Sequence, residues 1–347
     1  MTALTIPARP EQDAGLRPVP WPRMVWVTWR QHRVALAGVA VLLGALAVYL
    51  WIAGLQIHHA YATDCHPVGS LACGIDFSGR YGTTGIVVSI FLQAVPVLIG
   101  AFAGAPVLAR ELETGTFRFA WTQGMGRWRW TLAKLVLLAV VVTAAAGAFS
   151  VLYSWYNQPF FASGYAIPFS TRVFDLGEVA FAAWTLAAFS IGALAGMLIR
   201  RVVPAIAATL ASYAGLTLAT ALYLRQHYMT PLLTSHPNLP GSAWSVSQWY
   251  TKDGNFAFSA QGSQLVRTVT HFCPPRIWTS NHGEIRVHSG GNGSPAQCLS
   301  RHGYTQWTSY QPGSRFWAFQ WIESGWLVAL SVLLIAATVW LVRRRAA

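Results

Sequence analysis

Six long apolar runs constrain this chain more than any other feature of its sequence. An α-helix rises about 1.5 Å per residue, so about 20 apolar residues cross a hydrocarbon core of about 30 Å. Charged residues make up only 10% of the chain, whereas soluble domains contain about 25%. The sequence therefore predicts an all-α polytopic membrane protein with six transmembrane helices. These spans cover approximately residues 34–55, 84–108, 135–155, 179–199, 202–224 and 324–342.

Two of the spans contain residues that let helices bend or approach one another closely. Pro96 and Pro106 lie inside the second span, where each removes a backbone donor and favours a kink. G-x-x-x-G steps occur at 100–104 in the second span and at 192–196 in the fourth, and such steps allow close helix packing. This pattern is more typical of spans that move relative to one another than of spans that only anchor a protein in the membrane.

Basic residues predict the orientation of the chain. Fifteen arginines and lysines lie in the N-terminal segment, in the segment 109–135, after the fourth span and in the C-terminal tail, whereas the two short opposite loops hold only Arg80 and Arg172. Positive residues accumulate on the cytoplasmic side of a membrane. We therefore expect a multi-pass protein of the plasma membrane with both termini in the cytoplasm. The net charge of +13 follows from this bias, and no nucleic-acid-binding module accompanies it.

The four cysteines agree with this orientation. All of them fall in loops assigned to the outside, where disulfides are permitted. Nearness in the sequence favours Cys65 with Cys73 and Cys273 with Cys298. Four cysteines allow three connectivities, so the pairing stays open.

The predicted organisation has four parts. Residues 1–33 form a cytoplasmic tail, whose segment 21–33 is either an interfacial helix or a basic flank of the first span; we expect no cleaved signal peptide. Residues 34–224 hold the first five spans. Residues 225–319 form a large extracytoplasmic insertion, with short strands possible at 264–270 and 284–287. Residues 320–347 hold the sixth span and a basic cytoplasmic tail.

Catalytic and energy-coupling motifs are missing from the sequence. It has no G-x-x-x-x-G-K-[ST], H-E-x-x-H or G-x-S-x-G pattern, so we expect no enzyme activity and no catalytic residue on this chain. The histidines and cysteines of the outer loops match no metal-ligand spacing. The spans hold almost no ionisable residue for a proton relay; Glu178 and Glu323, at the outer ends of spans, are either interfacial anchors or a polar contact on an exit path. Energy must then come from a partner.

The segment 109–135 can receive that energy. It lies between the second and third spans, and Glu111 and Glu113 directly follow the second. Gly115 permits a positive φ and Thr116 can cap the next helical segment, so the helix should break there. We expect Trp130 at the membrane interface. The segment is either a rigid lever that a partner pushes or an ordinary basic loop with interfacial tryptophans.

At these residues the chain resembles the type-2 ABC exporter permeases, and more narrowly an actinobacterial branch of them. The segments 26–33 and 314–323 also resemble that branch, although its compact members have a shorter region before the last span. The residues that carry the resemblance in the hairpin 109–134, and to which it gives the role of coupling to an ATPase, are Glu111, Glu113, Gly115, Thr116, Trp121, Thr122, Gln123, Arg127, Trp130 and Lys134.

The resemblance implies a permease that couples a separate ABC ATPase subunit to export. Two permease copies, identical or different, would pair with two ATPase subunits in the lipid bilayer, and the second and fifth spans would line the exit path. ATP and magnesium would bind to the ATPase, with no cofactor on this chain. The aromatic, weakly charged spans favour an amphipathic or lipidic substrate or drug. The alternative is a membrane-anchored binding or sensing protein that works through residues 225–319.

Overall fold

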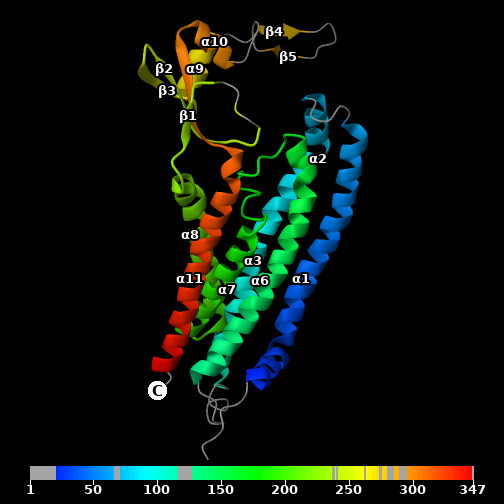
Figure 1. Ribbon diagram of the computed structural model, residues 1–347, viewed down its shortest axis with the longest axis vertical. Coiled ribbons are helices and arrows are strands. Elements are labelled where there is room, and N and C mark those ends of the chain that lie inside the picture. Colours follow the sequence, from blue (N-terminus) through cyan, green and yellow to red (C-terminus); the bar gives the residue numbers. More distant parts are fainter. Residues whose placement is uncertain are drawn as a thin grey trace, which may run out of the picture.

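The protein is a bundle of long helices with a small sheet at one end (Figure 1). Six of its helical segments are long and apolar enough to cross a membrane, which confirms the predicted polytopic membrane protein. The computed structural model describes residues 21–65, 71–115, 127–236, 239, 241–261, 263–272, 276–279, 285–288 and 295–345.

The six membrane-crossing segments follow one another along the chain. The first is α1 (Trp21–Asp64), the third α6 (Arg127–Ala162), the fourth α7 (Ala180–Ile199) and the sixth α11 (Phe316–Arg345). The second consists of α2 (Leu71–Gln93), α3 (Val95–Ile99), the π-helix η1 (Gly100–Gly104) and α4 (Pro106–Thr114). The fifth consists of α8 (Val202–Ala219), the π-helix η2 (Thr220–Leu224) and the 3-10 helix η3 (Arg225–His227).

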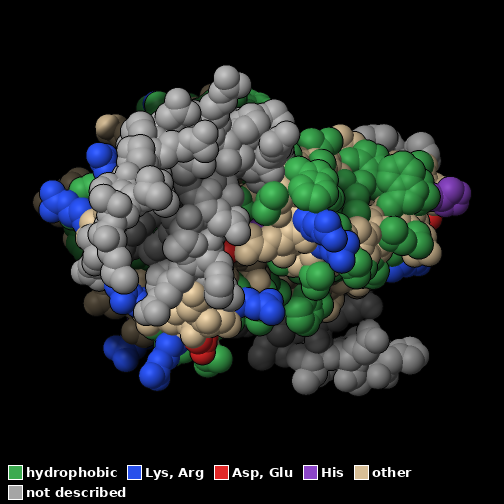
Figure 2. Space-filling view, turned by 90° about the horizontal axis from the view of Figure 1, so that it is seen from below, with side chains coloured by type: hydrophobic (Ala, Val, Ile, Leu, Met, Phe, Trp, Pro, Cys, Tyr) green, Lys and Arg blue, Asp and Glu red, His purple; other side chains and the backbone are tan. Residues whose placement is uncertain are grey.

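The two ends of the bundle differ in charge. The helix α1 begins and α11 ends at the same end (Figure 1), and we call this the basic end because arginines gather there. Figure 2 views the molecule from this end and shows Lys and Arg side chains at several points, with few acidic side chains in the described part. We call the opposite end the sheet end. The basic residues described at the basic end include Arg30, Arg33, Arg110, Arg200, Arg201, Arg343 and Arg344.

The second span is interrupted where its prolines predict. A turn at Ala94 separates α2 from α3, and Pro96 lies in the first turn of α3. Pro106 begins α4 one residue after the end of the π-helix. Proline lacks the N–H that a regular helix would use, so the backbone changes its hydrogen-bond pattern around each one. The second span is therefore one long helix, α2, followed by three short helical pieces, between which its backbone is irregular.

The helix α7 forms the centre of the bundle and is the most buried of the six spans. It packs against α6, α8, α11 and the pieces of the second span. Close approach depends on small residues. A Cβ atom on Gly192 would lie 2.3 Å from the carbonyl oxygen of Gly100, and one on Gly196 would lie 2.3 Å from that of Ala105. The predicted G-x-x-x-G steps thus face each other across one helix interface.

Replacing Gly192 with alanine should destabilise the bundle. The added methyl group would meet backbone atoms, which cannot swing away as a side chain can, and overpacking of this kind costs about 1–3 kcal/mol. Gly215→Ala in α8 is the matched control, since a Cβ atom there meets nothing within 4 Å. Thermal unfolding of the purified protein in detergent should show a lower midpoint for Gly192→Ala only. Equal midpoints would contradict the close packing.

Several helices extend beyond their predicted ends. No break separates residues 21–33 from the first span, and α1 continues to Asp64 into the expected loop 56–82. This extension packs on α6, where His58 stacks on Trp155 with ring centroids 4.6 Å apart. The expected loop is therefore mostly helical. Packing between neighbouring helices, and not hydropathy, sets where these helices end.

The region after η3 contains a sheet, so the all-α prediction applies to the membrane bundle alone. Its antiparallel strands have the order β1-β6-β2-β3, and two further strands, β4 and β5, form a hairpin. The turn between β2 and β3 uses Asp253 and Gly254, both with positive φ. The elements are β1 (Leu232–Thr234), β2 (Trp244–Lys252), β3 (Asn255–Ser259), α9 (Ser263–Phe272), β4 (Arg276–Thr279), β5 (Ile285–His288), α10 (Pro295–Arg301), β6 (Tyr304–Gln311) and the 3-10 helix η4 (Gly313–Arg315).

One of the two expected strands in this region is wrong. Residues 264–270 lie in the helix α9, whereas the strand expected at 284–287 appears as β5 one residue later. Leu265 and Val269 are four residues apart and both pack against the buried cluster of Tyr250, Phe258 and Leu299. That spacing places both on one helix face, although β-branched valine is a residue type that is also frequent in strands.

Candidate functional site

The predicted hairpin joins the second and third spans at the basic end. The helix α4 ends at Thr114, and Gly115 follows with a left-handed φ of 71°, which glycine adopts without strain. The helix α6 begins at Arg127. The predicted break after the second span is therefore present. Four predicted coupling residues lie outside the described residues: Thr116, Trp121, Thr122 and Gln123.

Glu111 and Lys134 form an ion pair inside the basic end. Nζ of Lys134 donates to Oε1 of Glu111 over 2.5 Å, and the lysine side chain is fully buried. Nε2 of Gln31 donates to the same oxygen over 2.6 Å. A buried ammonium group needs such a partner, because an unpaired charge away from water is very costly. Glu111 thus joins α4 to both α6 and α1.

Glu113 makes a different connection from the same helix. Its Oε2 accepts a hydrogen bond from the backbone N–H of Val202 over 3.1 Å, at the start of α8. The first N–H groups of a helix lack partners within the helix, and a negative charge is favourable beside them. Glu113 therefore joins the second span to the fifth. Together the two glutamates tie α4 to three other spans.

Two further predictions about side chains can be compared with the structure. Trp130 was expected at the membrane interface but is only 6% exposed, so it packs inside the bundle. Cys65 and Cys73 form a disulfide between α1 and α2. Cys298 is also disulfide-bonded, while Cys273 lies outside the described residues.

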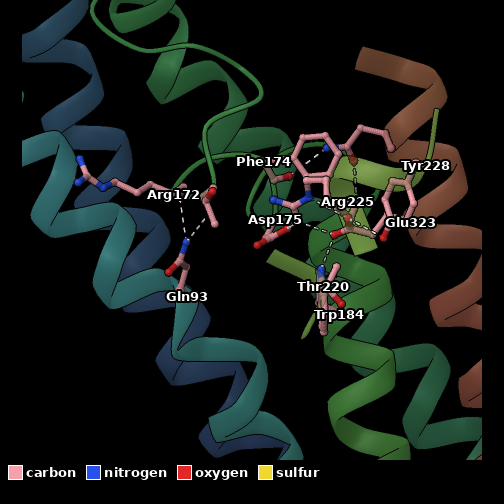
Figure 3. A network of polar contacts seen from close by, with 12 residues as sticks. Gln93, Arg172, Phe174, Asp175, Trp184, Thr220, Arg225, Tyr228 and Glu323 are labelled. Atoms are coloured by element: carbon pink, nitrogen blue, oxygen red, sulfur yellow. Dashed lines mark hydrogen bonds and ion pairs between the residues drawn. The ribbon is translucent and has the colours of Figure 1, made fainter. Parts of the chain in front are cut away.

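A second cluster of charges lies at the sheet end, and the sequence did not predict it as a unit. Figure 3 shows Arg225 of η3 between Asp175 and Glu323. Its Nε and Nη2 donate to the two oxygens of Glu323 over 3.0 and 2.8 Å, and Nη2 also donates to Asp175. The Arg225 and Glu323 side chains are almost completely buried, whereas that of Asp175 is 20% exposed. We call these three residues the charge triad.

Aromatic side chains complete the surroundings of the triad. Nε1 of Trp184 and the hydroxyl of Tyr228 donate to Glu323 over 3.0 and 3.2 Å. The guanidinium of Arg225 lies 4.3 Å from the ring centroid of Phe174, a favourable cation–π arrangement. Its buried Nη1 finds no acceptor within the described part of the chain. Burial is the main cause of a raised pKa of Asp175; Arg225 opposes this rise and Glu323 adds to it.

The burial of Glu323 corrects one interpretation drawn from the sequence. Glu323 is 0% exposed, so it is not an interfacial anchor; it makes a buried polar contact with Arg225, while its place on an exit path stays a prediction. Glu178 is partly exposed, and its backbone carbonyl accepts a hydrogen bond from Ser150. Arg225 at the end of one apolar run and Glu323 at the start of the next have opposite charges. This complementarity is the sequence signal that could have indicated the pair.

A cavity of about 530 Å³ lies between the second, fourth and fifth spans, beside the triad. The loop between α6 and α7 closes one wall, since Nε2 of Gln93 donates to the carbonyl oxygens of Thr171 and Arg172 over 2.9 and 3.3 Å. The lining residues are Gln93, Ala94, Pro96, Val97, Thr171, Asp175, Leu176, Trp184, Leu210, Tyr213, Ala214, Thr217, Leu218 and Ala221.

Comparison of the chain with models of known protein families identifies the family to which it belongs. A model described as "ABC-2 membrane transporter related" matches residues 39–225. The match covers more than half of the chain, so the protein belongs to this family. It is a membrane permease component of an ABC transporter, and its family implies an ATPase partner. No curated protein and no solved structure matched the chain.

The matched residues run from within α1 to Arg225. They include most of the first and fifth spans, the three spans between them, the hairpin and the cavity, but not the sheet or α11. The family character of the chain thus resides in the part of the bundle that holds both Glu111 and Asp175.

Proposed function

We propose that the chain is the permease subunit of an ATP-driven exporter of the plasma membrane. Its basic end faces the cytoplasm, and the sheet lies outside. A separate ATPase subunit docks on the hairpin 109–134 and binds the ATP and magnesium. Two permease copies and two ATPase subunits form the working unit. This chain contributes no catalytic residue and no cofactor site, and its segments 26–33 and 314–323 support a place in an actinobacterial branch of the family.

The ties made by the two glutamates carry this proposal. Glu111 bonds to Lys134 and Gln31, and Glu113 bonds to the start of α8. A displacement of α4 would therefore be transmitted to α1, α6 and α8 together, because the bonds at its end are short and the ion pair is buried. A partner that moves the hairpin can in this way change the arrangement of four spans.

The position of the cavity supports a transport path beside the second span. The cavity lies between the second and fifth spans, the two that line the exit path in the exporters this chain resembles. Within the second span, the turn at Ala94 lines the cavity and the π-helix η1 follows a few residues later. Such irregular helices bend more easily than regular ones. The mainly apolar lining favours an amphipathic or lipidic substrate.

Co-purification tests the proposal. The full-length permease, expressed with the ATPase genes of its source, should retain one ATPase through detergent extraction and gel filtration. Two copies of each subunit are expected in the complex, which mass photometry can count. The retained ATPase should hydrolyse ATP in a permease-dependent manner. If no ATPase is retained, and hydrolysis is independent of the permease, the proposed function is wrong.

A further inference from the structure

The charge triad is not electrically balanced. It contains the carboxylates of Asp175 and Glu323 but only one guanidinium, that of Arg225. Within the described part of the chain, Arg225 is the basic partner of both acids, and Arg172 extends away from them (Figure 3). One negative charge therefore remains when both acids are ionised. Burial of an unmatched charge is unfavourable, so the triad is better suited to a state in which a further cation is present.

The unmatched charge is accessible from the cavity. Glu323 is completely buried and is held by both ends of the Arg225 guanidinium. Asp175 lines the cavity, and one of its oxygens accepts from Arg225. Burial raises the pKa of Asp175, which means that the protein alone disfavours its charged form and that a neighbouring cation would stabilise it.

Aromatic rings stand beside Asp175 in the same cavity. Trp184 and Tyr213 both line it, and their rings meet edge to face with centroids 5.6 Å apart. The faces of such rings attract organic cations, most strongly where water is excluded. A carboxylate next to two aromatic side chains is thus a suitable environment for an ammonium or phosphonium group. The buried Nη1 of Arg225 does not line the cavity, so it offers no competing anion site there.

The rest of the cavity is mainly apolar and is open to the surface of the bundle. Leu210 and Leu218 of α8 are 40% and 60% exposed, and Ala94 on the second span is also exposed. These three exposed lining residues are apolar, so a ligand that enters past them must itself present apolar surface. The volume of about 530 Å³ lies within the range of about 300–1,000 Å³ found for pockets that hold drug-sized molecules.

We propose that this cavity binds an amphipathic organic cation, with the charged group beside Asp175 and the apolar body along α8. This inference rests on the proposed function, because such a cation would be the class of substrate that the permease exports. It goes further in naming the charge of the substrate and the residue that selects it.

Binding of a matched pair of hydrophobic ions tests the inference. Tetraphenylphosphonium and tetraphenylborate have nearly the same shape and opposite charge. Purified full-length permease in lipid nanodiscs, without ATPase, should bind more phosphonium than empty nanodiscs of the same lipid in equilibrium dialysis, and should bind no more borate than those empty nanodiscs do. Asp175→Asn should weaken phosphonium binding by about tenfold or more, since it removes a charge that water screens poorly. The Arg225–Glu323 pair stays complete in this variant, so the fold should persist.

Two further variants distinguish a specific effect of the Asp175 charge from a general effect of altering this loop, and test whether the ligand occupies the cavity. Glu178→Gln removes a partly exposed acid three residues away in the same loop and should leave phosphonium binding unchanged. Ala214→Trp fills the cavity while keeping the triad and should abolish binding. Equal binding of the two ions, or unchanged phosphonium binding by Asp175→Asn, would overturn the inference. If the permease binds no phosphonium but still assembles with an ATPase that hydrolyses ATP normally, the inference is wrong and the proposed function stands. If the permease binds phosphonium through Asp175 but assembles with no ATPase, the proposed function is wrong and the cation site stands.

Discussion

Replacing Arg225 with methionine should destabilise the bundle more than any other single change at the sheet end. Methionine fills similar space but leaves the carboxylates of Asp175 and Glu323 without their shared cation. Removal of one partner from a buried ion pair costs about 3–5 kcal/mol, because the remaining charge cannot be solvated. Chemical unfolding in detergent micelles should therefore give a free energy of unfolding lower by about that amount.

A graded series of variants checks that the loss of stability in Arg225→Met comes from the buried carboxylates that are left without a cation. Glu323→Gln should cost less, since Arg225 keeps Asp175 as its partner and one hydrogen-bonding group remains. The triple variant Asp175→Asn, Arg225→Met, Glu323→Gln should recover much of the loss, because no buried charge is left. Arg172→Met, at an exposed arginine of the neighbouring loop, is the matched control and should resemble the wild type. If Arg225→Met unfolds like this control, the triad has no structural role.

The spans could be predicted from the sequence because the bilayer imposes a simple rule. Every backbone polar group inside it must be paired, so helices of about 20 apolar residues are required. The prolines at 96 and 106 also predicted interruptions correctly, since their missing N–H groups act locally. Helix ends were harder to predict. The extension of α1 to Asp64 depends on contacts such as that of His58 with Trp155, which no local pattern encodes.

The two charge clusters show the same contrast. Glu111 and Lys134 are only 23 residues apart and lie at the adjoining ends of the second and third spans, so the sequence brings them into one segment. Arg225 and Glu323 are 98 residues apart, and each borders an apolar run. Charged residues at such borders usually reach the headgroups, so the sequence left Glu323 as either an interfacial anchor or a polar contact and placed Arg225 in the extracytoplasmic region. They are removed from water by tertiary packing: α7 against α11 places Trp184 beside Glu323, and Phe174 covers the guanidinium of Arg225.

Glu111→Ala should uncouple ATP hydrolysis by the partner from movement of the permease. The change leaves the buried ammonium of Lys134 without its carboxylate and removes the acceptor of Gln31. The end of α4 then loses its ties to α1 and α6, while the tie of Glu113 to α8 remains. Coupling between sites is commonly worth about 1–3 kcal/mol, or about 5- to 150-fold. We expect permease-stimulated ATP hydrolysis in proteoliposomes to fall by a factor in this range.

The matched control and a conservative variant determine whether coupling or folding is lost. Asp64→Ala breaks the exposed ion pair with Arg80 at the opposite end of the bundle, and exposed pairs contribute only about 0–1 kcal/mol, so hydrolysis should be unchanged. Glu111→Gln keeps an oxygen acceptor for Lys134 and should give an intermediate rate. Gel filtration must show that each variant still carries the ATPase. An intact Glu111→Ala complex with the wild-type rate would show that α4 does not transmit the movement, because its two strongest ties would be gone without effect.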